Sequence, residues 1–231
     1  MKLLKPESYR NGIIWSSAFN VCGRSMAFLQ HWLVGFYFGT HSDTDVFFFT
    51  YNIILFISYF FQNFTIAVLV PKGIDLRIRS SERDSVGFFN GFLAIYTSSG
   101  LLLFLLASGF TVPLFSHVSS FSEDILASNI ELMRWCLPMV FLNIVICLMT
   151  EIMASYKYFT FPNTVNLINS TLGVVFILLF HDVLGLRSVA MGLVFGYVIN
   201  LLLLILSMKR LLKWRFFVCS FRKVKTVMSS G

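Results

Sequence analysis

The sequence predicts an all-α membrane protein, a polytopic bundle of six transmembrane helices. Hydrophobic residues make up 57% of the 231-residue chain, charged residues make up only 13%, and the mean hydropathy is +0.78. Soluble domains carry about 45–50% apolar and about 25% charged residues, so this composition is too apolar for a water-exposed surface. The apolar residues also gather in six segments, each of which reaches or approaches the roughly 20 residues that a helix needs to cross the hydrocarbon core.

The six expected spans lie near residues 12–38, 46–70, 88–113, 130–156, 161–181 and 187–208. Gly39 and the polar HSDTD stretch end the first span, the Pro-Lys-Gly stretch at 71–73 ends the second, and Pro113 ends the third. Pro138 removes a backbone hydrogen bond inside the fourth span and is expected to kink it. Pro162 falls in the first turn of the fifth span, where a missing amide donor does no harm. The first apolar run is too long for a signal peptide, so we interpret it as a retained span.

Basic residues in the gaps between spans set the expected orientation, because lysine and arginine accumulate on the cytoplasmic side. The gaps of one side hold Lys2, Lys5, Arg10, Lys72, Arg77, Arg79, Arg83, Lys157, Lys209, Arg210, Lys213, Arg215, Arg222, Lys223 and Lys225. The loops of the other side hold Arg187 beside several acidic residues. Both termini are therefore expected on the cytoplasmic side of the cell inner (plasma) membrane. The net charge of +7 is an orientation signal, and nucleic acid is not an expected partner.

Residues 209–231 are expected to form a cytoplasmic tail in which basic residues alternate with Trp214, Phe216, Phe217 and Phe221. This composition is typical of an interfacial helix on an anionic inner leaflet, so anionic lipids are an expected partner of the tail. The four cysteines form no C-x-x-C pair, and neither a disulfide framework nor a zinc site is expected. No metal or other cofactor is expected.

Arg24 is the most informative single residue, because it lies in the middle of the first apolar span. A charge at such depth costs roughly 2.5 to 3.5 kcal/mol on insertion scales, so it normally faces a bundle interior or a watery cavity. At 100° per residue, Asn20, Arg24 and His31 fall within about 40° of one another and give the helix a polar face. Asn20 and His31 could serve only as interhelical hydrogen-bonding groups. All three are candidate substrate-binding residues.

The second span repeats this arrangement. Asn52, Tyr59 and Asn63 share one stripe of the helix, with Gln62 adjacent, and these three are also candidate substrate-binding residues. The fifth span begins with a run of polar residues in which three asparagines drift around one side of the helix. Helix packing explains these asparagines adequately; they are Asn163, Asn166 and Asn169.

The fourth span carries Asn143, Cys147, Thr150 and Glu151, which are spaced i, i+4, i+7 and i+8. Glu151 lies about one turn from the cytoplasmic end, so its carboxylate could reach the interface and pair with Lys157. Alternatively, it is a cavity partner for Arg24 or a proton site. Asn143 and Glu151 are therefore candidate coupling or cavity residues.

Enzymatic motifs are absent from the sequence. It has no G-x-S-x-G, H-E-x-x-H or P-loop pattern and no cluster of histidine and aspartate that could hold a metal ion. Asp43 and Asp45 stand close together in a short outer loop, where Asp45 is well placed to cap the second helix. Arg134 is interpreted as an anchor that pairs with Glu131 or reaches phosphate headgroups.

The stretch GRSMAFLQHWLVGFYFGTHSDTDVFFFTYNI, which begins at Gly23, resembles the first two helices of the MurJ/MviN-type lipid II flippases. This family belongs to the multidrug/oligosaccharidyl-lipid/polysaccharide exporter superfamily. The shared features are a small residue before an arginine in helix one, Phe38-Gly39, Thr44-Asp45 followed by aromatics, Val70-Pro71, Leu137-Pro138, and Phe161-Pro162 with Tyr158-Phe159 and Asn169 nearby. Together they cover nearly all of the chain. The sequence departs from the family at Ile57-Ser58, where another arginine is usual, and at Gln62-Asn63, which replace an acidic-glycine pair.

The resemblance implies that Arg24 occupies a cationic central cavity that receives the pyrophosphate of a lipid-linked sugar. It also implies a two-lobed transporter of which this chain corresponds to the N-terminal lobe. Alternating access rocks one repeat against another, and six helices supply only one repeat. We therefore expect the N-lobe of a flippase for a lipid-linked oligosaccharide, such as a peptidoglycan or other cell-wall precursor. A second lobe is expected, as a separate chain or a copy of this one, unless the gene is truncated.

Three alternatives stay open at this point. The first is a multidrug-type exporter lobe that uses Glu151 or Asp45 for cation coupling. The second is a non-transporting protein, either a truncated remnant or an assembly partner. The third, an enzyme acting on lipid-linked sugars, lacks a catalytic constellation in the sequence.

Overall fold

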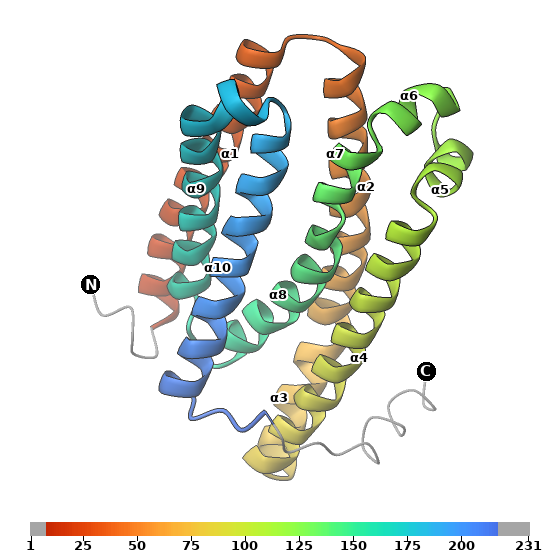
Figure 1. Cartoon of the computed structure of the whole chain (residues 1–231). Helices are drawn as coiled ribbons and strands as arrows, with labels where there is room; N and C mark the ends of the chain where they lie inside the picture. The colour runs from red at the N-terminus through yellow and green to blue at the C-terminus, as the bar shows by residue number, and fades with distance from the viewer. Residues whose placement is uncertain (1–7, 217–231) are drawn as a thin grey trace.

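The computed structural model describes residues 8–216, and the regular elements in this range are all helical (Figure 1). In chain order they are α1 (Tyr9–Phe38), α2 (Ser42–Phe64), a π-helical turn (Thr65–Leu69), α3 (Val70–Arg79), α4 (Glu82–Gly109), α5 (Thr111–Val118), α6 (Glu123–Ser128), α7 (Ile130–Cys136), α8 (Pro138–Ser155), α9 (Thr160–Leu184) and α10 (Arg187–Leu211). Consecutive pieces join into long helical segments of the length a membrane span requires. The expected all-α class is confirmed.

Five of these segments are both long and apolar enough to cross a membrane within the described part of the chain: Ser42–Arg79, Glu82–Gly109, Ile130–Ser155, Thr160–Leu184 and Arg187–Leu211. The sixth long segment, α1, has 30 residues but also carries Asn20, Arg24, Gln30 and His31. These polar side chains lower its hydropathy, while its length suffices to span the hydrocarbon core. The chain is a multi-pass membrane protein, and the expected helix count is approximately right.

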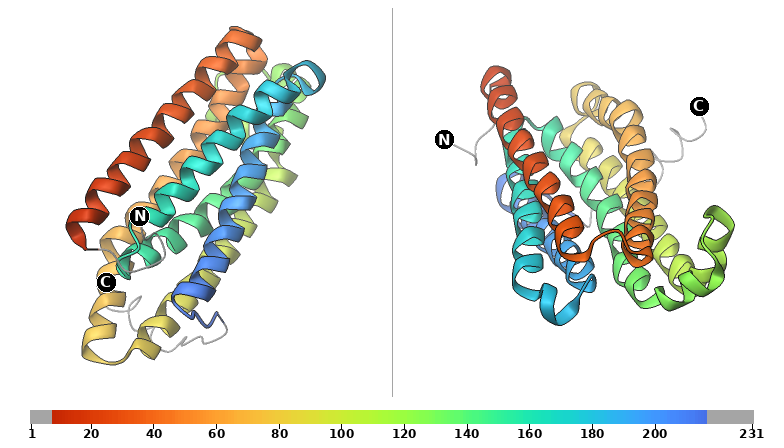
Figure 2. Two further views of the ribbon diagram at one scale, coloured as in Figure 1. Left: turned by 90° about the vertical axis from the view of Figure 1, so that its left-hand side faces the viewer. Right: turned by 90° about the horizontal axis from the view of Figure 1, so that it is seen from above.

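The helices form two groups with α8 between them (Figures 1 and 2). α9 packs against both α1 and α10 on one side, while α3 packs against α4 on the other. α8 contacts α2, α4 and α10. Of the most apolar stretch of the α7–α8 segment, 72% of the residues are buried, against 22% for the segments of α9 and of α2–α3. The central helix is therefore the core of the bundle, and the outer helices keep faces that no other described helix covers.

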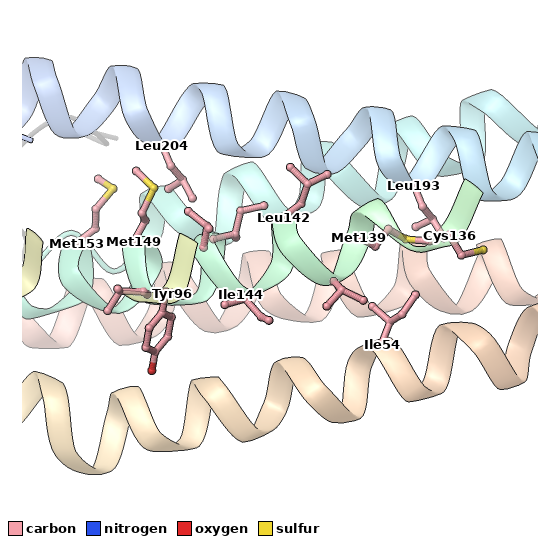
Figure 3. Packing of buried hydrophobic residues seen from close by; sticks show 14 of the residues in the cluster. Ile54, Tyr96, Cys136, Met139, Leu142, Ile144, Met149, Met153, Leu193 and Leu204 are labelled. Carbon is pink, nitrogen blue, oxygen red and sulfur yellow. The ribbon is translucent and has the colours of Figure 1, made fainter. Parts of the chain in front are cut away.

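Figure 3 shows how α8 holds the two groups together. Its side chains reach Leu193 and Leu204 of α10 on one side, and Ile54 of α2 and Tyr96 of α4 on the other. Most of these side chains are Leu, Ile, Val and Met, which fill space without needing polar partners. The packing positions α2, α9 and α10 around α8, and these four helices enclose the larger cavity described below.

The sequence predicts that the second span ends at Pro71. In the structure its helical segment runs on to Arg79. A proline inside a helix normally clashes with the carbonyl four residues earlier. Here a π-helical turn over Thr65–Leu69 precedes it, with the Val70 amide donating to the Thr65 carbonyl five residues back. This widened turn relieves the clash, so Pro71 starts α3 as one of its first residues instead of stopping the chain.

Other proline and capping expectations have mixed outcomes. The break at Pro138 is confirmed, because α7 ends at Cys136 and Pro138 is the first residue of α8. Pro162 lies in the first turn of α9, as expected. Pro113 lies inside α5 and does not end α4, which stops at Gly109. The prediction that Asp45 caps the second helix is wrong, because the N-cap position is His41 and Asp45 lies in the first turn.

The ends of α3, α4, α8 and α10 meet at the lower end of Figure 1, which we call the basic end. Its described basic residues are Arg10, Lys72, Arg77, Arg79, Arg83, Lys157, Lys209, Arg210, Lys213 and Arg215. Gly73 of α3 lies directly against the ring of Phe89, and a Cβ atom at Gly73 would overlap that ring. Arg77 donates to the carbonyl of Ser155 at 2.9 Å and stacks over the Tyr156 ring at 4.3 Å. The basic end is therefore tightly packed.

The segment after α10 contributes to this packing. The Trp214 side chain is only 5% exposed, and its Nε1 donates to Asn90 Oδ1 of α4 at 2.8 Å. Asn90 Nδ2 in turn donates to the Arg215 carbonyl at 2.6 Å. Trp214 thus lies in the protein interior and not on a lipid leaflet. The rest of the expected lipid-binding tail, residues 217–231, lies outside the described residues.

Candidate functional site

The polar side of α1 meets α9 around Arg24. Arg24 Nε donates to Asn20 Oδ1 at 2.9 Å, one turn earlier on the same helix. Asn20 Nδ2 then reaches Asn163 Oδ1 of α9 at 3.4 Å. The two helices run close together here, since a Cβ atom at Gly23 would lie in ordinary van der Waals contact, at 3.9 Å, with the backbone of Leu167. The structure therefore brings together two of the three polar residues predicted on the first helix.

A cavity of about 200 Å³ lies beside Arg24, and we call it the Arg24 cavity. Its lining residues are Phe19, Asn20, Gly23, Arg24, Ala27, Asn163, Asn166 and Ser170. Arg24 is the only ionisable group among them, and no carboxylate within residues 8–216 forms an ion pair with it. The described hydrogen bond of the Arg24 guanidinium goes to a neutral amide, so the side chain has further N–H donors to offer a ligand. The cavity is suited to an anion.

A second cavity of about 240 Å³ lies among α2, α8, α9 and α10, and we call it the Tyr59 cavity. From α2 and α10 it is lined by Leu55, Ser58, Tyr59, Gln62 and Tyr197. From α8 and α9 it is lined by Asn143, Ile146, Cys147, Thr150, Asn166, Asn169 and Ser170. Asn166 and Ser170 line both cavities. The two cavities thus share a wall on α9. We use the name open face for the surface that carries the two cavities.

Two amide atoms at the Tyr59 cavity have no hydrogen-bond partner within the described part of the chain. They are Asn143 Nδ2 on α8 and Asn169 Oδ1 on α9, and the Asn169 side chain is only 7% exposed. The Tyr197 hydroxyl interacts with the side chains of Tyr51, Asn143 and Asn169. Both amide atoms are fully buried, and Asn169 Oδ1 lies against Gly196 of α10, so they belong to the packed polar cluster behind the cavity wall.

Glu151 lies at the edge of the Tyr59 cavity. Its Oε1 accepts a hydrogen bond from Gln62 Nε2 of α2 at 3.5 Å, near the limit for such a bond. The sequence left open whether this carboxylate pairs with Lys157 or faces a cavity, and the contact with Gln62 favours the cavity side. The bond also links α2 to α8 just above the π-helical turn.

Other predicted site residues lie apart from the two cavities. His31 packs edge-on against the rings of Phe48 and Tyr51, at 5.5 and 6.1 Å between ring centres, and so bridges α1 and α2. Asn52 Nδ2 donates to the carbonyl of Phe48 in its own helix, and Asn63 lies on an exposed face. Neither asparagine lines the Arg24 or the Tyr59 cavity. Of the predicted stripe on α2, only Tyr59 and the adjacent Gln62 face a cavity.

Sequence reasoning missed Tyr197, Ser58 and Ser170 as cavity residues. Tyr197 follows Gly196 in an otherwise apolar span, and a Cβ atom at Gly196 would overlap Asn169 Oδ1. A small residue beside a tyrosine in a membrane helix is the signal that could have shown a close approach to a polar neighbour. The structure also shows no group of three or more His, Cys, Asp or Glu side chains that could hold a metal ion within the described residues.

Known proteins resemble this chain in fold. No protein-family model and no curated protein sequence matches it. One similar solved structure is an outward-facing multidrug resistance MATE family transporter of the MOP superfamily, with 15% identity, a TM-score of 0.70, and coverage of 99% of this chain and 51% of that chain. A second is a MATE protein in complex with MaD3S, with 14% identity, a TM-score of 0.71, and coverage of 99% and 52%.

A third similar structure is a MOP superfamily transporter from Pyrococcus furiosus Vc1 (DSM3638), described as having a binding pocket of reverse polarity. It shares 16% identity with this chain, with a TM-score of 0.68 and coverage of 98% of this chain and 51% of that one. The chain thus has the fold of about half of each of these transporters. At these identities the matches show the fold alone, and the family and the substrate belong to the proposal below.

Proposed function

We propose that this chain is one lobe of a membrane transporter that moves a lipid-linked oligosaccharide across the bilayer, and that Arg24 binds the anionic pyrophosphate link. The observation that carries the proposal is Arg24 itself, a cation at a cavity whose other lining residues are uncharged. Keeping a charge at this depth is costly unless an anion or water compensates it. Arg is also the side chain whose planar donors best match phosphate oxygens.

The proposal includes a second lobe that faces the open face. Alternating access moves one repeat against another around a site at their interface. The two cavities lie on a surface of α1, α2, α8 and α9 that no other described helix covers. The chain also spans about half the length of the transporters that it matches. A second lobe would close these cavities and complete the site.

The proposed location is the cell inner (plasma) membrane with the basic end in the cytoplasm. Most of the described basic residues gather at one end of the bundle, while the opposite end holds Arg134 and Arg187 together with Asp43, Asp45, Glu123, Asp124 and Asp182. Lysine and arginine in short loops favour the cytoplasmic side. Under this proposal, α1 starts and α10 ends on the cytoplasmic side.

A second candidate function is a multidrug-type exporter lobe that takes organic cations. The observation that favours it is the Glu151 carboxylate at the edge of the Tyr59 cavity, next to Gln62. One solved structure of similar fold is a multidrug resistance transporter. The net charge of the open face decides between the two candidates, and Arg24 favours an anion where Glu151 favours a cation.

Native mass spectrometry of the purified chain in nanodiscs tests the anion proposal. Undecaprenyl pyrophosphate is the probe, and undecaprenol, with the same tail but no charge, is its control. We expect the wild type to retain the pyrophosphate lipid preferentially, Arg24→Ala to weaken retention at least tenfold, and Arg24→Lys to keep part of it. Arg134→Ala, which removes an exposed arginine outside both cavities, should have no effect.

Equal retention of the two lipids, or retention unchanged by Arg24→Ala, would contradict the proposal. A complementary assay measures ethidium uptake by proteoliposomes that contain the chain. Ethidium uptake that Glu151→Gln abolishes and Arg24→Ala leaves unchanged would favour the multidrug-type alternative.

A further inference from the structure

We infer that the elbow between α4 and α5 binds one acyl chain of a membrane phospholipid. We call the hollow in this elbow the elbow groove, and its lining residues are Leu106, Phe110, Pro113, Leu114, His117 and Val118. The groove lies at the end of the bundle opposite the basic end, and across the bundle from α1 (Figures 1 and 2). It shares no residue with the Arg24 or the Tyr59 cavity, so the inference does not depend on the proposed function.

The elbow forms because the chain turns at Phe110. This residue ends α4 and precedes α5 with a φ of −120° and a ψ of 37°, which lies outside the α-helical region. Thr111 and Phe115 bury one face of α5 in the bundle, where the Phe115 ring packs against that of Phe49 on α2 at 6.2 Å between centres. The other face of α5 and the last turn of α4 form the two walls of the groove. The groove is therefore a preformed feature of the folded bundle.

The groove offers a ligand apolar contacts only. Its one polar side chain is that of His117, whose Nδ1 lies 2.7 Å from the Pro113 carbonyl oxygen. Because a carbonyl oxygen can only accept a hydrogen bond, Nδ1 carries the hydrogen and donates it within α5. The atoms that the groove exposes are all apolar. Water, an ion or a sugar would find no hydrogen-bond partner there, whereas a hydrocarbon chain needs none.

The groove also continues a surface that faces the bilayer. α4 is long and apolar enough to cross a membrane. Its exposed leucines lie on one side of the helix and lead to the groove; they are Leu101, Leu102, Leu105 and Leu106. Phe110 and Leu114 are exposed in the same way. Because the molecules next to such a surface are lipids, the occupant is a chain from the leaflet on the side opposite the basic end.

The size of the groove matches one chain. Its volume of about 430 Å³ exceeds that of either cavity on the open face. A methylene group is close in size to a water molecule, which takes up ~30 Å³, so the groove holds about fourteen methylene groups, most of one acyl chain. Lipid tails are as apolar as leucine, so van der Waals packing drives association inside the bilayer. A concave groove contacts a chain on several sides and supplies more of this packing than a flat helix face.

Native mass spectrometry of the full chain, released from nanodiscs of a single phospholipid, tests this inference. The probes are dipalmitoyl phosphatidylcholine and phosphatidylethanolamine, which have no net charge, and dipalmitoyl phosphatidylglycerol, which is anionic. We expect the chain to retain one molecule of each, with occupancies within about twofold, because the groove contacts the tail and not the headgroup. Dihexanoyl phosphatidylcholine, with the same headgroup as the first probe and short tails, should be retained at least tenfold less.

Site variants identify the groove. Leu114→Trp fills it with a larger ring and should lower the occupancy of dipalmitoyl phosphatidylcholine at least fivefold. Val118→Trp fills it from the end of α5 and should act in the same way, even if the first variant folds poorly. Leu179→Trp makes the matched change at an exposed leucine of α9, outside the groove, and should leave the occupancy unchanged.

Three results would overturn the inference. Retention of phosphatidylglycerol alone would indicate a headgroup site at the basic end. Retention that both Leu114→Trp and Val118→Trp leave intact would place the lipid elsewhere on the bundle. No retained phosphatidylcholine would mean that the groove contacts only exchanging bilayer lipid. Failure of the proposed function is distinguishable, because it concerns a pyrophosphate lipid at Arg24, and Arg24→Ala should leave phosphatidylcholine retention unchanged.

Discussion

The basic end and the open face of this lobe are built in opposite ways. At the basic end, Asn90 satisfies both the Trp214 indole and the Arg215 carbonyl, and Gly73 lets α3 lie directly on Phe89. On the open face, the amides of Asn143 and Asn169 keep unpaired atoms and two cavities interrupt the packing. The two regions thus differ in whether their buried polar groups form hydrogen bonds between helices. The basic end uses these bonds to hold helices together, whereas the packing behind the open face leaves two amide atoms without partners among the described residues.

The largest expected effect comes from filling the closest contact at the basic end. Gly73→Leu should lower the free energy of unfolding by about 3 kcal/mol, because even its Cβ atom would overlap the buried Phe89 ring. Titration of the detergent-solubilised protein with SDS measures this loss. Gly35→Leu is the matched control on α1, where no atom lies within 4 Å of the added Cβ. A loss of similar size at Gly35 would remove the contrast between the two regions.

The next effect concerns the Asn90 bridge. Asn90→Leu should cost about 2 kcal/mol, since it leaves the Trp214 indole N–H, which is buried, without its acceptor. Asn52→Leu makes the same change on the exposed side of α2, where the amide bonds only to its own helix, and should cost less than about 0.5 kcal/mol. The same SDS titration compares them. Equal losses would show that Asn90 contributes no more than a surface residue.

The smallest expected change in stability comes from the two arginines. Arg77→Ala should cost about 1.5 kcal/mol, because it removes the hydrogen bond to Ser155 and the contact with the Tyr156 ring. Arg24→Ala should cost under about 0.5 kcal/mol, since it removes only one bond to Asn20, while weakening pyrophosphate-lipid retention at least tenfold. Thermal unfolding followed by lipid binding on the same samples measures both. A destabilising Arg24→Ala would make Arg24 a structural residue.

The fold class could be predicted from the sequence because membrane spans need long apolar runs, and those are visible in the order of residues. The break at Pro138 was also predictable from the missing amide. Pro71 was not, because the π-helical turn that accommodates it depends on backbone spacing that no residue type specifies. Trp214 was expected on a lipid surface, and its burial depends on Asn90, which lies 124 residues away in sequence.

The candidate site was predictable in part for the same reason. Asn20 and Arg24 lie one turn apart on one helix, so helical periodicity alone places them together. Asn143 and Tyr59 were selected as polar residues inside spans, and the structure places both at one cavity. The contribution of Tyr197 depends on how closely α9 and α10 approach at Gly196. Such distances between helices follow from tertiary packing and are not encoded in a single span.

The π-helical turn at Thr65–Leu69 also has a rotational consequence. A turn that uses one extra residue sets back the phase of every following residue by roughly 100° about the helix axis. In an unbroken α-helix, Gln62 and Gly73 would point in nearly the same direction, since eleven residues make roughly three full turns. With the phase set back, Gln62 faces Glu151 of α8 while Gly73 faces Phe89 of α4. One inserted residue thus lets a single span present its cavity side and its anchoring side to different neighbours.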